Sequence, residues 1–381
     1  MQKQKSYRSY EKKIFNEVQK FMCQFSTKEV QGHALKRINT MSGLVSGMIS
    51  AKSCSLNNIG SGIDKDINAQ SKEIAASRFL ENKNTDYKVH YLPYIKQFIL
   101  GFLLKNKISL DCSSEQNRIY LAIDGSQMGS NYVCLMISLV VGKRSIPIFW
   151  VVKEGKKGHF PTEMHLEVIQ GAIGYLRSFL GDTLGFILLG DGEFDSCELQ
   201  KLCQEIKIDY VLRTSKISLM YEDGEEFQPY KLHLSGKTKN FFIPDIAFSK
   251  EKLENVNFLY WFDQKLYENP LYLVSSLDNA PDIMFAYRKR FAIETLFKDF
   301  KSRGFNLHKT RITHELSIIN LIMVACLAFY FLMDFGYRNE NNPLKIKVQR
   351  IDKNVNSIFS FAQAFLQYLC DENLDFSFAP T

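Results

Sequence analysis

Four side chains that suit metal or phosphate chemistry recur at helical spacing between Tyr287 and Lys301. The stretch YRKRFAIETLFKDFKSRGF, residues 287–305, places one carboxylate among bases and aromatic rings. On a helix that turns by about 100° per residue, Tyr287, Arg290 and Lys301 lie within about 40° of Glu294. A salt bridge between Arg290 and Glu294, four residues apart, would explain that pair alone. A site for a cation and a polyanion would explain all four side chains.

Two further carboxylates follow apolar runs that are typical of strands. Asp124 ends YLAID and precedes Gly125, and Asp191 ends FILLGD and precedes Gly192. Asp before Gly is common in turns, so either residue alone could be a turn residue. At the tips of two strands in one sheet, however, both carboxylates would be held rigidly at a cleft. Together with Glu294 they could bind two divalent cations and support phosphoryl transfer.

The elements that must position these carboxylates follow an α/β pattern. Three apolar, β-rich runs, joined by tight turns, occupy residues 118–124, 132–142 and 144–154. They are followed by a helix at 162–180, a buried strand at 184–191, a second helix at 195–206 and a further strand at 210–215. This order predicts a mixed sheet flanked by helices. Residues 215–280 are β-rich and irregular, which indicates an all-β insertion that ends in a strand at 271–277.

Charge divides the chain unevenly. Residues 1–110 contain eighteen Lys and Arg against eight Asp and Glu, whereas the remainder contains thirty against thirty-three. Apolar residues recur at helical spacing in this first part. We therefore expect a helical, basic, DNA-binding domain at 1–110, with a solvated basic helical domain as the alternative. The other predicted parts are a linker at 111–117, the core at 118–214 and 281–335, the insertion at 215–280, and a helical tail at 336–381 that could mediate dimerisation.

The remaining composition predicts a protein of a reducing compartment. The eight Cys form no CxxC pair, and the first residues are polar, so we expect a cytoplasmic, nucleoid-associated protein. Residues 316–333 are apolar and long enough to cross a membrane. Ser317 and Asn320 interrupt them and no second such segment exists, so we expect a buried core helix and no membrane association.

These motifs resemble a known family. The early strands and the two Asp residues resemble a ribonuclease-H-like fold. The spacing Y-x2-R-x3-E-x6-K is similar to the signature of bacterial DDE transposases of the insertion sequence 4 family. LGDGEFDS and YVLRTS resemble the block around the family's second Asp, and KTRITHELSIINLIMVACLAF resembles the segment after its Glu. The resemblance covers about residues 119–335. The sequence departs from it at Gly192, where relatives often have Arg, and at Ser126, where many have Thr.

The resemblance implies a function and a set of site residues. It implies a cut-and-paste transposase that acts on inverted element ends and target DNA as a homodimer, with two Mg2+ ions that Mn2+ can replace. By position, the metal ligands would be Asp124, Asp191 and Glu294, and the contacts to the DNA backbone would come from Tyr287, Arg290 and Lys301. Glu193 and Asp195 lie close to Asp191, which we retain because it alone ends the strand.

Two other functions remain open from the sequence. One is a ribonuclease-H-like nuclease that cuts without joining, and the other is a catalytically inactive derivative that only binds DNA. Two weaker sites are a metal pair of His159 with His165 and a base-stacking platform at Trp261. For Trp261 we favour a packed core of the insertion.

Overall fold

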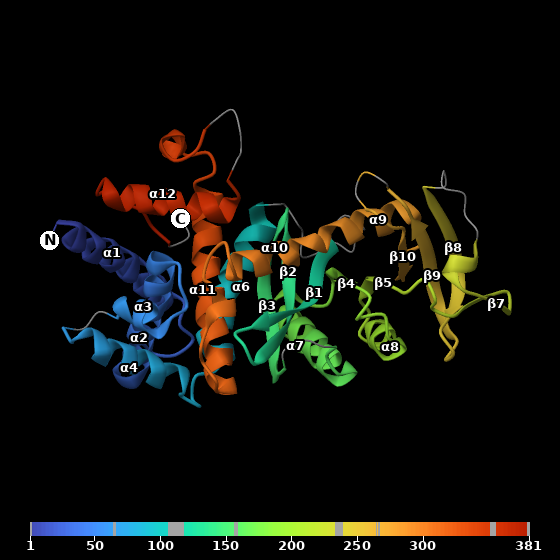
Figure 1. Ribbon diagram of the computed structural model, residues 1–381, viewed down its shortest axis with the longest axis horizontal. Coiled ribbons are helices and arrows are strands. Elements are labelled where there is room, and N and C mark those ends of the chain that lie inside the picture. The colour runs from blue at the N-terminus through green and yellow to red at the C-terminus, as the bar shows by residue number, and fades with distance from the viewer. Residues whose placement is uncertain are drawn as a thin grey trace.

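The computed structural model describes residues 2–63, 66–105, 118–155, 159–232, 239–263, 265, 267–350 and 356–378. The predicted linker at 111–117 lies outside these residues. Figure 1 shows an elongated arrangement in which the N-terminal helices lie at one end and the strands of the β-rich insertion at the other. The helix α11 (Glu315–Arg338) stands between the N-terminal helices and the sheet.

One ten-stranded sheet runs through the rest of the molecule, in the order β3-β2-β1-β4-β5-β10-β9-β8-β6-β7. Its first five strands are β1 (Arg118–Met128), β2 (Tyr132–Val141), β3 (Arg144–Glu154), β4 (Gly185–Gly190) and β5 (Asp209–Arg213). The strands β1, β2 and β3 are antiparallel, and β4 and β5 are parallel to β1. This is the arrangement of a ribonuclease-H-like sheet, and the predicted fold class is confirmed.

The central strands are apolar on both sides because helices cover both faces. Every residue of β2 is buried. The helix α7 (Thr162–Leu180) contacts β2 and β3, and the helices α10 (Phe291–Phe300) and α11 also contact β3. The helix α8 (Cys197–Glu205) connects β4 to β5. Continuous runs of apolar residues are the expected sequence of such doubly covered strands.

The β-rich insertion continues the core sheet. Its strands are β6 (Met220–Glu222), β7 (Glu225–Phe227), β8 (Asn240–Phe248) and β9 (Leu253–Trp261), with a short 3-10 helix η1 (Pro229–Leu232). The strand β10 (Leu271–Ser275) pairs with β9 on one side and with β5 on the other. Trp261 is 3% exposed, so it belongs to the packed core of the insertion.

The first part of the chain is helical, as predicted. Its helices are α1 (Gln2–Gln24), α2 (Gly32–Ala51), α3 (Leu56–Ser61), α4 (Ala69–Leu80), α5 (Tyr87–His90) and α6 (Leu92–Lys105). The helix α3 lies very close to α2, because a Cβ on Gly47 would meet the Ile59 carbonyl oxygen at 2.3 Å. The division into domains stays a prediction.

The apolar segment at 316–333 forms a core helix, which confirms that prediction. Within α11, 89% of the most apolar 18-residue window is buried. The helix contacts α2 and α4 on the N-terminal side, β3 in the sheet, and the C-terminal helix α12 (Ile358–Asp371). The short 3-10 helices η2 (Leu307–Lys309) and η3 (Pro343–Lys347) flank it in the chain.

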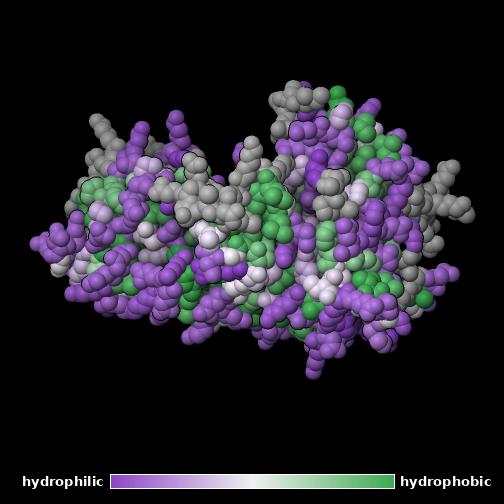
Figure 2. Space-filling view, turned by 180° about the vertical axis from the view of Figure 1, so that it is seen from behind, coloured by the Kyte–Doolittle hydropathy of each residue, from purple (hydrophilic) through white to green (hydrophobic). Residues whose placement is uncertain are grey.

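The seven described cysteines are free thiols. In the view of Figure 2 the surface is mainly hydrophilic, with hydrophobic side chains in separate patches.

Candidate active site

Asp124 and Asp191 lie on the same side of the sheet's pairing between β1 and β4, just past the last paired residues of these two neighbouring strands. Asp191 directly follows β4. Asp124 lies inside β1, so the prediction that it ends the strand is wrong. The strand continues because the hairpin with β2 pairs it as far as Met128. Its parallel pairing with β4 nevertheless ends at Ala122, opposite Leu189, so both carboxylates lie just beyond the region where β1 and β4 are joined.

Local contacts fix the orientation of each Asp. The Gly125 amide donates to Oδ1 of Asp124 at 2.8 Å, and the Glu193 amide donates to Oδ1 of Asp191 at 3.0 Å. Gly125 also faces the ring of Phe160, because a Cβ at this position would lie 2.6 Å from the Phe160 Cε2 atom. A side chain at residue 125 would therefore displace the Phe160 ring.

The stretch from Tyr287 to Lys301 is two helices rather than one, so that prediction is corrected. The helix α9 (Ala280–Lys289) ends and α10 begins at Arg290. The Arg290 amide donates to the Tyr287 carbonyl at 3.0 Å, a bond over three residues that tightens the turn and interrupts the regular ladder. Lys301 follows α10 with a non-helical backbone, φ −94° and ψ −116°. The common stripe calculated for one straight helix therefore does not hold over the whole stretch.

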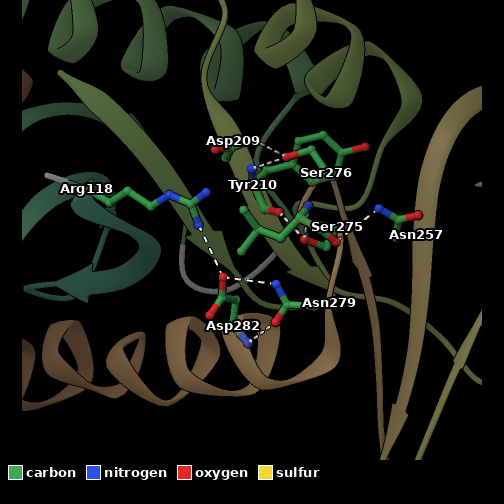
Figure 3. Close-up of polar contacts among 9 residues, drawn as sticks. Arg118, Asp209, Tyr210, Asn257, Ser275, Ser276, Asn279 and Asp282 are labelled. Atoms are coloured by element: carbon green, nitrogen blue, oxygen red, sulfur yellow. Dashed lines mark hydrogen bonds and ion pairs between the residues drawn. The ribbon is translucent and has the colours of Figure 1, made fainter. Parts of the chain in front are cut away.

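A polar network fixes the start of α9 on the sheet (Figure 3). Asn279 caps the helix by accepting a hydrogen bond from the Asp282 amide at 2.9 Å. The carboxylate of Asp282 forms an ion pair of 3.6 Å with Arg118, the first residue of β1. Just before the helix, the Ser276 hydroxyl donates to Asp209 of β5 at 2.9 Å. These contacts connect α9 to β1, which carries Asp124, and to β5, which is the next strand after β4 and Asp191.

A second anchor fixes α10, and the sequence reading did not identify it. Arg144, at the start of β3, donates to Asp299 at 2.5 Å, and the Asp299 side chain is completely buried. Burial raises the pKa of Asp299 to about 6 although Arg144 and Arg303 oppose the shift. The only signal in the sequence was a single carboxylate within the apolar pattern FKDF.

Arg290 lies between the carboxylates of the sheet and that of the helix. Its guanidinium donates to Glu294 Oε1 at 2.5 Å and is 3.7 Å from Asp124 Oδ2. The residue is only 7% exposed. Its charge therefore partly neutralises the half-buried carboxylates of Asp124 and Glu294, whose repulsion would otherwise be unfavourable.

Arg290 contacts two of the three predicted metal ligands, Asp124 and Glu294, and Asp191 follows the strand that pairs with β1. Burial raises the pKa of Asp124 to about 7, and the negative charges of Asp191 and Glu294 add to that rise. Arg290 and the Gly125 amide oppose it. Mutual repulsion of this kind is found where several carboxylates share one site.

The other two predicted residues flank this cluster. Tyr287 is 1% exposed, and burial raises the pKa of its phenol. Its ring centre lies 5.8 Å from the Arg290 guanidinium. Burial lowers the pKa of the Lys301 ammonium, and the charge of Asp124 opposes that shift. Lys301 thus lies within electrostatic range of Asp124 despite being outside the helix.

The competing carboxylates near Asp191 have other partners. Glu193 accepts a hydrogen bond from the Phe160 amide at 2.6 Å and lies 3.6 Å from His165 Nε2. Asp195 accepts a hydrogen bond from the Thr214 hydroxyl at 2.6 Å. Both side chains therefore have hydrogen-bond partners of their own, whereas Asp191 directly follows β4, the strand that pairs with β1.

Comparison with known proteins supplies the family. The family model described as the transposase DDE domain matches residues 139–331, about half of the chain. The chain belongs to this family. The matched region contains Asp191 and the whole stretch from Tyr287 to Lys301, and it begins after Asp124. A transposase DDE domain implies transposase activity, so the protein is an enzyme that acts on DNA.

The other comparisons add less. No curated protein matches the chain. Human endonuclease V is 12% identical, with 56% of this chain and 84% of that chain covered and a TM-score of 0.27. Endonuclease V of Ciona intestinalis, solved with a 24mer DNA containing inosine, is also 12% identical, with 56% and 93% covered and a TM-score of 0.27. Marinitoga piezophila Argonaute with guide RNA and target DNA is 14% identical, with 68% and 34% covered and a TM-score of 0.21. At these TM-scores the matches carry no functional argument.

The carboxylates of this transposase domain have the chemistry of a divalent-metal site. Oxygen ligands suit Mg2+ and Mn2+, and a cation would offset the burial and the repulsion that together raise the pKa of Asp124. Among the described residues, no three His, Cys, Asp or Glu side chains are already grouped at ligand distance. Arg290 pairs with both Asp124 and Glu294 instead. The buried Nε atom of Arg290 has no hydrogen-bond partner in the described part of the chain.

Proposed function

We propose that the protein is a cut-and-paste DNA transposase of the insertion sequence 4 type. The observation that carries this proposal is the buried guanidinium of Arg290, which contacts Asp124 of β1 and Glu294 of α10, with Asp191 at the end of the neighbouring strand β4. Asp124, Asp191 and Glu294 would hold two divalent cations, Mg2+ by expectation and Mn2+ as a substitute. When bound, such cations activate a hydroxyl nucleophile and stabilise the leaving oxygen of a phosphodiester.

The side chains around the carboxylates bind and position DNA in this proposal. Arg290 and Lys301 contact backbone phosphates, which fixes the register of the DNA without reading its sequence. The Arg290 Nε atom has no hydrogen-bond partner within the described residues and is available for such a contact, whereas the terminal nitrogens now pair with carboxylates. Tyr287 is buried beside Arg290, so in this proposal it supports the Arg290 side chain that contacts the phosphate.

The proposed reaction is a series of phosphoryl transfers. The oxygen of water forms a bond to phosphorus at the element end as the bond to the 3′ oxygen breaks, which leaves a 3′-OH. The family resemblance implies that this hydroxyl attacks the opposite strand to give a hairpin, which a second water opens. The regenerated 3′-OH then attacks a phosphodiester of target DNA. Each step exchanges one P–O bond for another, so no oxidant or energy source is needed.

The remaining partners follow from the same proposal. The substrates are the inverted repeats at the element ends and a target duplex, and the active form is a homodimer on DNA. The basic helical part at 1–110 binds the ends, and the tail at 336–381 contributes to the dimer. We place the protein in the cytoplasm, associated with the nucleoid.

A strand-transfer assay tests the proposal. Duplexes that carry the DNA flanking the gene, either uncut or with an exposed 3′-OH, are incubated with a plasmid target and Mg2+. We expect cleavage of the uncut duplex and joining of both, and loss of both reactions in Asp124→Asn, Asp191→Asn and Glu294→Gln. Asp182→Asn is the control, because this carboxylate is 86% exposed and belongs to an unrelated ion pair with Arg177. Cleavage without joining would indicate a nuclease instead, and binding without cleavage an inactive derivative.

A further inference from the structure

A groove between α2 and α4 is lined by bases, and no acid is among its lining residues in the described part of the chain. Its volume is about 610 Å3, and its charged and ionisable lining consists of His33, Lys36 and Arg37 from α2 and Arg78 from α4. Lys36 and Arg78 are exposed, and within the described residues neither forms an ion pair. Arg37 differs because its guanidinium donates to the Asn84 carbonyl at 2.9 Å. Unpaired exposed cations on two facing walls create a positive potential along the groove.

The groove also has polar lining residues and a rigid shape. Thr40 and Ser71 line it, and the Thr40 hydroxyl donates to the Lys36 carbonyl of its own helix at 3.0 Å. Ser71 belongs to the first turn of α4, where the helix dipole favours a negative group. The walls are fixed because α2 and α4 both pack against α3 and the core helix α11. Exposed Ile67 and Ile74, at 41% and 44% exposure, provide apolar surface at the same place.

A second group of bases extends from the other side of α4 toward the catalytic carboxylates. A cavity of about 690 Å3 lies between α4 and residues 306–314, and Lys309, Arg311 and His314 are among its exposed lining residues. Glu73 and Glu81 also line this cavity, so it is less uniformly basic than the groove. Thr310 in the same segment lies against Gly129 at the turn after β1. The segment therefore connects the helical end of the molecule to the hairpin that carries Asp124.

We propose that the groove between α2 and α4 binds the phosphate backbone of duplex DNA. Resting on the proposed function, this inference assigns the end-binding surface to particular residues, with Lys36 and Arg78 as phosphate contacts on opposite walls. Duplex DNA fits better than a small anion, because the bases are distributed over two helices and are followed by further bases along residues 309–314. The DNA then runs from α2 and α4 past this segment to the carboxylates.

The test compares two double variants of the full chain that remove the same charge. Lys36→Ala/Arg78→Ala removes two bases of the groove. Lys88→Ala/Lys96→Ala removes two bases of a different cavity, which is also lined by Glu163 and Glu167. A fluorescent duplex of arbitrary sequence is titrated with each protein across a KCl series without divalent metal. Thermal unfolding of each variant checks that the fold is retained.

We expect the groove variant to lose about two phosphate contacts. Its salt slope should fall by about two, and its affinity near 0.1 M salt should fall by roughly 60-fold. The control variant should bind as the parent does. The inference is overturned if the groove variant matches the parent, or if both variants weaken equally. If the parent itself binds no duplex, the proposed function fails as well, so the two failures can be distinguished.

Discussion

Asp124→Asn should make the chain more stable, and increasingly so as the pH rises. The carboxyl group of Asp124 has its pKa raised from 3.8 to about 7, first by burial and then by Asp191 and Glu294. A group whose pKa is higher in the folded chain than in the unfolded chain binds more protons when folded. Its contribution to stability is therefore complete below about pH 4 and is lost as the pH rises to about 7. The carboxamide that replaces the carboxyl group carries no charge, so the variant avoids this loss.

The size of the effect follows from the pKa values. One unit of pKa difference corresponds to about 1.4 kcal/mol. Between about pH 5 and about pH 8 the wild-type chain crosses roughly two units of the shift, which amounts to at most about 3 kcal/mol. The side chain is 20% exposed, so solvent reduces this figure somewhat. The Gly125 amide can still donate to the carboxamide oxygen, which preserves the local geometry.

The assay is urea unfolding of both chains at several pH values without divalent metal. The quantity of interest is the stability of the variant minus that of the wild type, because other titrating groups cancel in that difference. It should grow by about 2–3 kcal/mol between about pH 5 and about pH 8 and then remain constant. Asp182→Asn, at an exposed site, should show no such growth. Parallel pH profiles for Asp124→Asn and the wild type would show that Asp124 is not held in a buried acidic cluster.

Three further outcomes follow from the same geometry. Glu294→Gln should retain DNA binding and lose cleavage by orders of magnitude in Mg2+. Lys301→Ala should instead weaken binding to every duplex and lower the salt slope by about one. Fluorescence anisotropy and cleavage, both measured on one substrate, distinguish the two variants. Asp191→Ala should abolish cleavage while leaving the unfolding midpoint unchanged or slightly raised, and normal cleavage would move the second ligand elsewhere. Asp299→Ala should destabilise the chain by about 3 kcal/mol in urea unfolding, because it leaves Arg144 buried without its partner, and an unchanged midpoint would contradict that account.

Local sequence was sufficient for features that depend on neighbouring residues. The β-rich runs before Asp124 and Asp191 predicted strands, because alternation and apolar runs report how a segment is buried. The 18-residue apolar segment was recognised as a core helix through its two polar residues, and Asn320 indeed donates to the Leu80 carbonyl at 2.7 Å inside the protein. A salt bridge between Arg290 and Glu294 was the alternative explanation for that pair from its spacing of four residues, and the two side chains do form a hydrogen bond of 2.5 Å.

The tertiary structure decided how residues far apart in the chain meet. Strand register extended β1 beyond Asp124, and the pairing of β10 with β5 joined the insertion to the core sheet. A hydrogen bond over three residues at Arg290 divided the expected single helix, and packing of the helices on the sheet brought Arg290 to Asp124 as well as Glu294. Arg144 and Asp299 are 155 residues apart, and no pattern in the sequence pairs them. Contacts of this kind depend on how the helices and strands pack together, whereas periodicity records only which face of each element is buried.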